Sequence, residues 1–283
     1  MAKLFLSKEV NERLNEEIAQ SVDDLKARGI VPTLATIRVG ENDDDIAYEK
    51  SITKKFEKLS LAHKKVVLDE STSADEMISV IQKLNADEKI HGILIFKPLP
   101  KQLDDEEVTN AIAHKKDVDG ITDISMAKLY KGDSDAYSPC TAEAVIRILK
   151  HYGVELSGKN VVVIGRSLVI GRPLALMLVR ENATVTICHS KTKNLSEISK
   201  KADIIVTAAG SIKLITKKFV SPGQILIDVG IHVDDEGKLV GDVNQSDVEN
   251  IVSALTPVPG GVGGVTTGLL ALATIKASSR RDK

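Results

Sequence analysis

The chain has 283 residues, of which 42% are apolar and 28% charged, and its formal net charge is −2. This balance argues against broad electrostatic binding of nucleic acid or of an anionic membrane. The sequence has neither an apolar run as long as a membrane span nor a signal-peptide pattern, so we expect a cytoplasmic protein, of two domains at this length.

The first half alternates strand and helix patterns. Short β-branched segments predict strands at Thr33–Val39, Lys64–Leu68 and Gly92–Ile95. Helical spacing predicts helices at Ile46–Leu59 and Ala74–Leu84. Strands that alternate with helices indicate parallel βαβ units, and therefore an α/β fold.

The second half repeats this order more clearly. Strands are predicted at Asn160–Ile164, Thr184–Cys188, Asp203–Thr207 and Gln224–Asp228. Helices are predicted at Pro173–Arg180, Leu195–Ala202 and Val265–Ala277, and a further helix near Thr141–His151 is expected to join the domains. Near-continuous Val and Ile runs are typical of strands buried on both faces, as in a doubly wound sheet.

A glycine turn follows the first strand of this half, in Gly165-Arg166-Ser167 and Gly171-Arg172-Pro173. Gly165 permits a sharp turn off the strand, Gly171 permits close packing of helix on sheet, and Pro173 suits a first helical turn. The spacing is not G-x-G-x-x-G, and an ordinary βα turn is the alternative. The three strands that follow favour a dinucleotide site, with the pyrophosphate at the helix N-terminus.

The end of the second strand bears on the choice of cofactor. An NAD site usually has Asp or Glu there for the ribose 2′-hydroxyl. This chain has His189, Ser190 and Lys191 instead, with Arg166 in the first turn. Hydroxyl and cationic groups suit a 2′-phosphate, so NADP is favoured over NAD.

The chain resembles the methylenetetrahydrofolate dehydrogenase/cyclohydrolase family over nearly its whole length. The motifs that carry this resemblance are Lys116-Asp117-Val118-Asp119-Gly120, Ser138-Pro139-Cys140-Thr141, Gly165-Arg166-Ser167, Cys188-His189-Ser190-Lys191-Thr192, Ile227-Asp228-Val229-Gly230-Ile231 and Thr256-Pro257-Val258-Pro259-Gly260-Gly261-Val262-Gly263. The resemblance implies a folate-binding α/β domain at 1–140, with the helix at 264–283 packed back on it. It also implies a Rossmann-like NADP domain with a doubly wound parallel sheet at 141–263.

The implied site residues are carried over one by one. Tyr48 and Asp119 match catalytic residues that also bind the substrate pterin, and Pro259, Gly260 and Gly261 match the loop against folate and nicotinamide. Alone, Tyr48 would be an ordinary helix residue and Asp119 part of an Asp-Gly turn. The implied cofactor contacts are Thr141, Gly165, Arg166, Ser167, Gly171, His189, Ser190, Lys191, Ala209, Gly210, Gly230 and Ile231.

Two positions depart from the family pattern. Bifunctional members have a lysine four residues after the tyrosine, where this chain has Ile52. They also have a glutamine where this chain has Phe96. Hydride transfer needs orientation and no strong base, whereas hydrolysis of the methenyl product needs an activated water. We therefore expect a dehydrogenase that produces 5,10-methenyltetrahydrofolate, with cyclohydrolase activity absent or very weak.

Three alternatives remain open: a bifunctional dehydrogenase/cyclohydrolase, a dehydrogenase acting on another substrate, and a dinucleotide-sensing module without turnover. The resemblance implies a role in one-carbon metabolism and purine biosynthesis, and a homodimer paired through the cofactor domain. The two cysteines, Cys140 and Cys188, and the scattered histidines have no metal-ligand spacing, so no metal is expected.

Overall fold

The computed structural model describes residues 1–103 and 105–280, which form two compact units. Unit 1 consists of Met1–Glu12 and Pro139–Thr266; unit 2 consists of Arg13–Ser138 and the chain from Thr267 onward. Two helices, α1 (Ser7–Ala27) and α10 (Gly263–Ser279), begin in unit 1 and end in unit 2. The helix expected at 264–283 thus has a counterpart in α10, and positions 281–283 lie outside the described residues.

Unit 1 is built on a six-stranded sheet in which every neighbouring pair is parallel. In spatial order the strands are β1 (Lys3–Leu4), β11 (Ala254–Leu255), β8 (Ile225–Asp228), β7 (Ile204–Thr207), β5 (Asn160–Ile164) and β6 (Thr184–Cys188). We expected residues 1–140 to form one domain. The structure instead places Met1–Glu12 in unit 1, because β1 pairs with β11 through Lys3 and Ala254.

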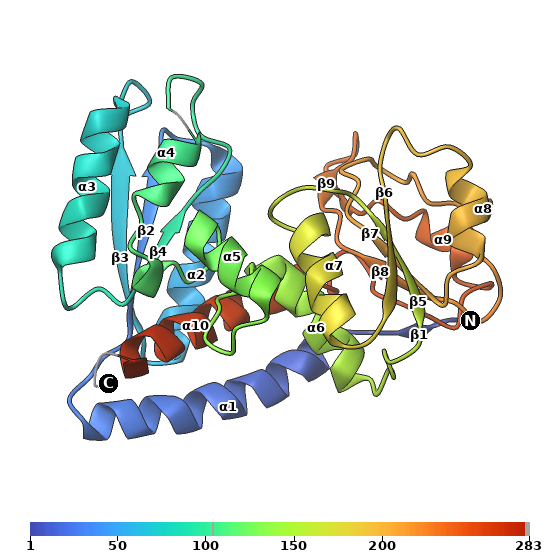
Figure 1. Ribbon diagram of the computed structural model, residues 1–283, viewed down its shortest axis with the longest axis horizontal. Helices are drawn as coiled ribbons and strands as arrows, with labels where there is room; N and C mark the ends of the chain where they lie inside the picture. Colours follow the sequence, from blue (N-terminus) through green and yellow to red (C-terminus); the bar gives the residue numbers. More distant parts are fainter. Residues whose placement is uncertain (104, 281–283) are drawn as a thin grey trace. The chain divides into compact units, whose positions relative to one another are not determined.

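Helices cover both faces of this sheet (Figure 1). On one face α7 (Gly171–Arg180) packs on β5 and β6, and α6 (Cys140–His151) packs on α7. On the other face α8 (Leu195–Lys200) and α9 (Gln245–Val248) contribute to a core that includes Val162 and Ile164. The doubly wound parallel sheet predicted from the sequence is therefore confirmed. A short hairpin of β9 (His232–Val233) and β10 (Leu239–Val240) follows β8.

Unit 2 contains a parallel three-stranded sheet in the order β3 (Ala62–Leu68), β2 (Thr33–Val39) and β4 (Gly92–Ile95). On one face α3 (Ala74–Ala86) and residues around α4 (Asp105–Asn110) enclose an apolar core that includes Ile37 and Ile93. On the other face α2 (Asp43–Lys58) lies against β2 and β3. The 3₁₀ turn His114–Lys116 and α5 (Asp123–Lys131) complete the unit before Ser138.

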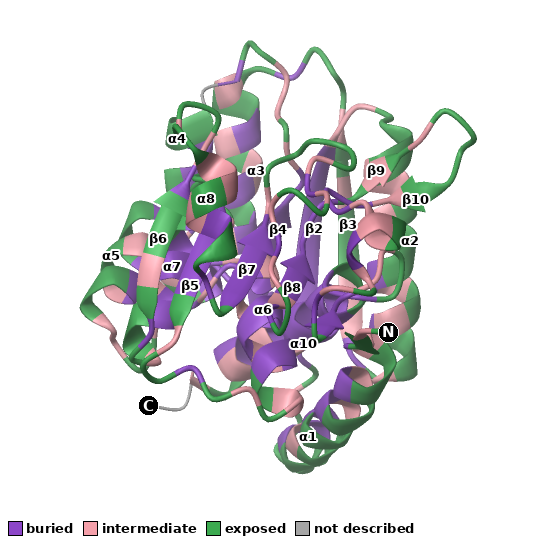
Figure 2. Cartoon of the chain, turned by 90° about the vertical axis from the view of Figure 1, so that its right-hand side faces the viewer, coloured by how far each residue is buried: buried purple, intermediate pink, exposed green. Residues whose placement is uncertain are grey.

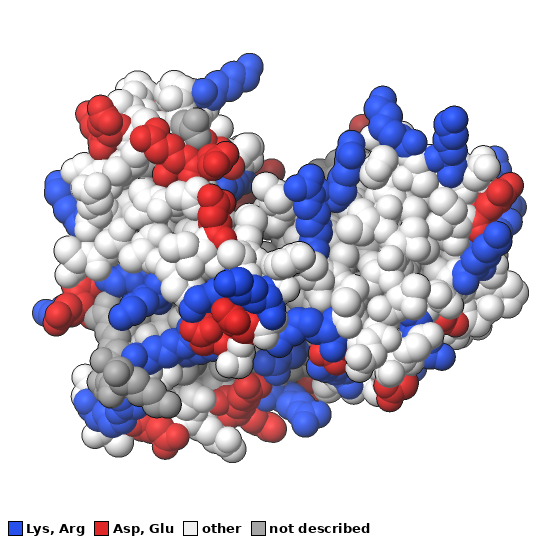
Figure 3. Space-filling model, in the orientation of Figure 1, with Lys and Arg blue, Asp and Glu red and all other residues white. Residues whose placement is uncertain are grey.

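The strand predictions agree closely with the structure. β2, β4, β5 and β6 have the predicted limits, and β4, β5 and β7 are largely buried, as Figure 2 shows. β6 differs, because it lies at the edge of the sheet and Ile187 is 39% exposed. Basic and acidic side chains are interspersed on the face shown in Figure 3. Among the described residues, no helix is long and apolar enough to cross a membrane.

Candidate functional site

The carboxyl ends of four strands bring most of the predicted cofactor residues to one edge of the unit 1 sheet. Ile164 at the end of β5 is level with Cys188 of β6 and with Thr207 of β7. Thr207 is in turn level with Asp228 of β8. The segments that leave these strands contain, in spatial order, His189, Ser190 and Lys191; Gly165, Arg166 and Ser167; Ala209 and Gly210; and Gly230 and Ile231. Ligands bind at such an edge in open α/β sheets.

The turn after β5 requires glycine at two positions. Gly165 has φ +138°, and a Cβ there would lie 2.3 Å from the carbonyl oxygen of Ala208. A Cβ on Gly171 would lie 2.1 Å from the carbonyl oxygen of Gly165. The Ser167 hydroxyl accepts a hydrogen bond from the Ile170 amide at 3.1 Å, which closes the turn just before α7. The positive N-terminal end of α7 therefore lies directly beside a tight, exposed loop.

A compact turn follows β6. The Thr192 hydroxyl accepts from the His189 amide at 2.9 Å, and the His189 ring Nδ1 accepts from the Lys191 amide at 3.1 Å. The side chains of Ser190, Lys191 and Arg166 are exposed. Hydroxyl and cationic groups are thus presented where β5 and β6 end side by side, an arrangement that can bind a phosphate.

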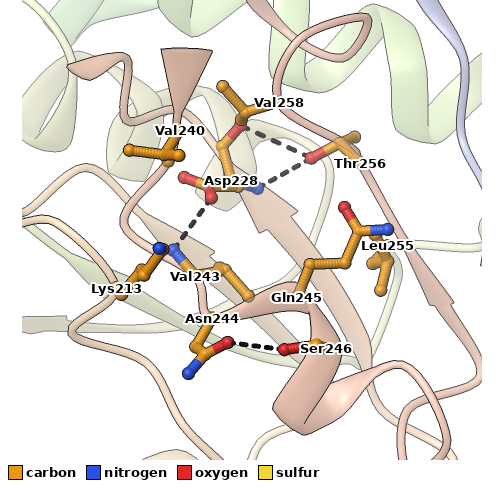
Figure 4. Close-up of a pocket in the computed structure, with 11 residues that line it drawn as sticks. Lys213, Asp228, Val240, Val243, Asn244, Gln245, Ser246, Leu255, Thr256 and Val258 are labelled. Carbon is orange, nitrogen blue, oxygen red and sulfur yellow. Dashed lines mark hydrogen bonds between the residues drawn. The ribbon is translucent and has the colours of Figure 1, made fainter. Parts of the chain in front are cut away.

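Asp228, at the end of β8, is 3% exposed and borders a cavity of about 220 Å³ (Figure 4). Burial raises the pKa of its carboxyl group to about 6, against the opposing effect of amide hydrogen bonds from Val243, Asp242 and Gly230. Its backbone amide donates to the Thr256 hydroxyl at 2.7 Å. Neither Asp228 nor Asp242 is among the site residues predicted from the sequence, because their contacts lie far apart along the chain.

In unit 2, Tyr48 and Phe96 are brought together. Their rings meet edge to face, with centroids 5.9 Å apart. Phe96 directly follows β4 and its amide donates to the Ile37 carbonyl at 3.0 Å. Ile52, one helical turn after Tyr48 on α2, is completely buried, and Phe96 is 6% exposed. Both positions that carry polar groups in the bifunctional pattern are therefore apolar and packed.

Lys97 is held away from this aromatic pair. Its ammonium group donates to the Asp105 carboxylate at 2.9 Å and to the Thr109 hydroxyl at 2.8 Å. Lys97 is therefore not positioned to replace the lysine that is missing at Ile52.

Asp119 lies in a rigid turn beside β4. The isolated parallel bridge between Ile93 and Asp117 puts the start of the turn beside β4, and the Gly120 amide donates to the Asp117 carbonyl at 3.2 Å. The Asp117 carboxylate accepts from the amides of Ile121 and Thr122 at 3.0 and 2.9 Å. Gly120 has φ +64°, and a Cβ there would lie 2.5 Å from the Tyr137 carbonyl. This turn fixes the backbone on which Asp119 stands.

A buried polar network that the sequence pattern did not predict lies between α2 and the sheet of unit 2. The Thr36 hydroxyl donates to the Glu49 carboxylate at 2.7 Å and lies 2.9 Å from His63 Nε2. The Thr53 hydroxyl lies 3.0 Å from His63 Nδ1. Burial lowers the pKa of His63, and the Glu49 carboxylate opposes this. The polar alternation in Thr36 and Arg38 on β2 was the signal that could have predicted it.

The segment Pro259–Gly261 belongs to unit 1, as does Thr141 in the first turn of α6. The family resemblance implies that Gly260 and Gly261 lie against a ligand. In the structure a Cβ on Gly261 would lie 2.5 Å from the Pro257 carbonyl, so this glycine is required by the chain itself. Gly263 and Gly264 are likewise enclosed, by Ile231 and Ser7. Only Gly260 of this glycine-rich run is open, with Pro257 Cγ at 3.9 Å as its one neighbour among the described residues.

The described residues contain no group of three or more His, Cys, Asp or Glu side chains placed to hold a metal ion. Cys140 and Cys188 are buried free thiols, and burial raises the pKa of Cys188.

Comparison with known protein families gives two matches along the chain. Residues 5–119 match the family described as tetrahydrofolate dehydrogenase/cyclohydrolase, catalytic domain. Residues 139–282 match the tetrahydrofolate dehydrogenase/cyclohydrolase, NAD(P)-binding domain.

Individual proteins are similar over the full length. The "Bifunctional protein FolD" of Clostridium botulinum (strain Okra / Type B1) is 46% identical over 282 residues, covering 100% of both chains. The crystal structure of the bifunctional enzyme FolD, a methylenetetrahydrofolate dehydrogenase/cyclohydrolase from Campylobacter jejuni, is 38% identical with a TM-score of 0.97, covering 99% of this chain and 100% of that one. The Trypanosoma brucei FolD structure, complexed with NADP cofactor and inhibitor, is 32% identical with a TM-score of 0.94, covering 100% and 99%.

Proposed function

The chain belongs to the tetrahydrofolate dehydrogenase/cyclohydrolase family, and we propose that it oxidises 5,10-methylenetetrahydrofolate with NADP. This proposal rests on the loops that follow β5, β6, β7 and β8 at the carboxyl edge of the unit 1 sheet. At Gly165 and Gly171 a Cβ would collide with neighbouring backbone, so only glycine permits this tight turn, and α7 begins directly after it. Such an arrangement fits a dinucleotide pyrophosphate.

NADP is proposed as the cofactor on two grounds. Arg166, Ser190 and Lys191 are exposed at the adjoining ends of β5 and β6, where a 2′-phosphate could accept their hydrogen bonds. The Trypanosoma brucei relative, moreover, is complexed with NADP. NAD remains the less favoured cofactor, because no carboxylate stands at the end of β6.

The residues of this chain act mainly by binding and orientation. In the proposed reaction a bound nicotinamide supplies the acceptor for a hydride from the one-carbon bridge. The Tyr48 ring, held by Phe96, offers an aromatic face for the pterin. Asp119, on its rigid turn, offers a carboxylate to the N–H groups of the pterin ring. Orientation of this kind can lower a barrier by roughly 7–11 kcal/mol at best.

Cyclohydrolase activity is the second candidate function. The relatives at 46% and 38% identity are named bifunctional, which favours the bifunctional alternative over complete loss of hydrolysis. The two site positions argue in the other direction. Ile52 is fully buried and Phe96 nearly so, and neither can activate water or move a proton. We propose that any hydrolysis by this chain is slow relative to hydride transfer.

A paired assay with the purified protein tests both parts. Reduction of NADP in the presence of methylenetetrahydrofolate is expected, with a lower kcat/KM for NAD. Loss of methenyltetrahydrofolate is expected to stay near the buffer rate. A hydrolysis rate equal to the dehydrogenase rate would overturn the second part, and substrate-independent NADP binding without reduction would support the sensing module instead.

A homodimer paired through unit 1 is also part of the proposal. The exposed apolar residues Val233 and Leu239 pair directly across the β9–β10 hairpin and could contact a second copy. Sedimentation velocity would test this: a dimer that becomes a monomer after replacement of both residues by Ser is expected.

A further inference from the structure

One buried carboxylate links several segments of the predicted cofactor site. Asp242 has no exposed surface. Its Oδ2 accepts hydrogen bonds from the Thr207 hydroxyl at 3.1 Å and from the Ala209 amide at 2.6 Å. Its Oδ1 accepts from the Ser211 amide at 2.9 Å and lies 2.8 Å from His232 Nε2. A single side chain therefore joins the loop after β7 to the start of the hairpin after β8.

Asp228 holds Asp242 in this position. The Asp228 Oδ1 accepts from the amides of Gly230 and Asp242 at 2.9 and 3.1 Å, and its Oδ2 accepts from the Val243 amide at 2.9 Å. Figure 4 shows the bond to Val243 together with the bonds between Asp228 and Thr256. Asp242 thus has a fixed backbone and a fixed side chain.

Two glycines make room for the pair. A Cβ on Gly241 would lie 1.9 Å from Asp228 Oδ2, and a Cβ on Gly230 would lie 2.5 Å from Asp242 Oδ1. Gly230, which the family resemblance assigns to cofactor binding, is buried against Asp242. Gly230 must be glycine because a side chain there would collide with Asp242, whether or not a ligand is bound.

We propose that Asp242 is a positioning residue for the cofactor: it sets the 207–211 loop and the 230–232 segment in the geometry that NADP binds. The inference rests on the proposed function, because these segments contain the expected contacts Ala209, Gly210 and Ile231. A carboxylate suits the role, since it offers two acceptor oxygens to the amide, hydroxyl and imidazole donors around it. An asparagine of the same shape has one acceptor oxygen, and its amide nitrogen would face donors.

The distinguishing measurement compares the affinity for NADP with the kinetics of the folate substrate. For Asp242→Asn we expect the NADP Kd, measured by titration calorimetry, to rise about tenfold or more, since a lost charge-assisted bond weakens binding on that scale. The KM for methylenetetrahydrofolate at saturating NADP is expected to stay within about threefold, because Asp242 acts on the cofactor loops. Without ligand, amide hydrogen exchange should accelerate at 209–211 while β5 and β7 remain protected.

Asp247→Asn is the matched control. Asp247 also accepts a backbone amide bond, from Lys217 at 2.8 Å, and it lies outside both cofactor segments. Its NADP Kd should match that of the wild type. If Asp242→Asn does not fold, Thr207→Val and His232→Ala each remove one bond to Asp242 and should each raise the NADP Kd about threefold.

The outcomes are separable. A folded Asp242→Asn protein, or the two single-bond variants, with wild-type affinity for NADP would overturn the inference. Equal losses of affinity for NADP and for the folate substrate would also overturn the inference, because Asp242 would then act on the whole protein and not on the cofactor segments alone. A wild-type protein that binds NADP but does not reduce it would instead refute the proposed reaction and leave the role of Asp242 intact.

Discussion

The rings of Tyr48 and Phe96 stand nearly at a right angle, with 88° between the ring planes and 5.9 Å between centroids. An aromatic pair of this geometry contributes about 0.5–1.5 kcal/mol beyond its burial. Phe96 therefore supports the ring proposed to contact the pterin, while it removes a polar group from the same place. The replacement proposed to slow hydrolysis is thus compatible with the proposed contact between Tyr48 and the pterin.

Restoring both polar groups should restore some hydrolysis. The double variant Ile52→Lys with Phe96→Gln is expected to consume methenyltetrahydrofolate at least about tenfold above the wild-type rate, within the usual range of acid–base catalysis. The decay is followed by absorbance of the methenyl compound. Ile52→Met is the control, because it keeps the site apolar at similar volume.

The same substitution should cost stability. Ile52 is completely buried, and an unpaired ammonium there is unfavourable. Ile52→Lys alone should lower the free energy of unfolding by several kcal/mol, whereas Ile52→Met should change it by less than about 1.5 kcal/mol. Urea denaturation measures both, and an equally stable Lys variant would show that position 52 reaches solvent.

The Gly165 turn can be tested against a glycine with similar backbone freedom. Gly165→Ala should abolish NADP binding or raise the Kd more than about 100-fold, because the Cβ would lie 2.3 Å from the Ala208 carbonyl and shift the loop. Gly158→Ala is the control: its φ is +73°, and no atom of the described residues lies within 4 Å of the added Cβ. Gly158→Ala should cost about 1 kcal/mol of stability and leave the NADP Kd unchanged.

Cofactor selectivity should depend on the turn after β6. Ser190→Asp places a carboxylate where a 2′-phosphate is expected, so kcat/KM for NADP should fall about tenfold to 100-fold. The value for NAD should fall less or rise, because its 2′-hydroxyl can donate to the carboxylate. Steady-state assays with each cofactor give the ratio of kcat/KM for NADP to kcat/KM for NAD. Equal losses of kcat/KM for both cofactors would show that Ser190 does not lie beside the ribose 2′ position.

Asp228 should give the protein a distinctive dependence of stability on pH. Its pKa is raised from 3.8 to about 6 in the folded protein, so the folded state keeps a proton that the unfolded chain releases between these values. The contribution of Asp228 to stability is therefore fully present below pH 4 and is lost as the pH rises through 6. The maximal slope is about 1.4 kcal/mol per pH unit.

Asp228→Asn removes this titration. The difference in unfolding free energy between wild type and variant should therefore shift in favour of the variant as the pH rises from 4 to 6. Urea titrations at closely spaced pH values measure this difference. Parallel curves for the two proteins would contradict the raised pKa.

The strands were predictable because their signal is local. A buried parallel strand needs an unbroken apolar run, and β4, β5 and β7 show one. Helix α1 was missed, although Val10, Leu14, Ile18 and Val22 recur every four residues and are all buried. The two-residue strand β1 had no such signal, because its partner β11 is about 250 residues away along the chain.

The residues of the candidate site also fall into those that the sequence could predict and those that it could not. Gly165 and Gly171 were identifiable because a turn between strand and helix requires them locally. The assembly of Asp242 with Thr207, Ser211 and His232 was not, since those bonds depend on how β7 and β8 lie side by side. The family resemblance named positions expected to contact ligands, and it did not indicate which residues hold those positions in place.

The division of each unit into separate chain segments constrains how such a protein can be recombined. Unit 1 needs Met1–Glu12 as well as Pro139–Thr266, because β1 covers the edge of β11. A fragment that starts at Pro139 would leave that edge open to pairing with other chains. Exchange of the cofactor unit between related genes would therefore require several crossovers, two of them inside the continuous helices α1 and α10. Such a gene should diversify mainly by point substitution rather than by domain shuffling.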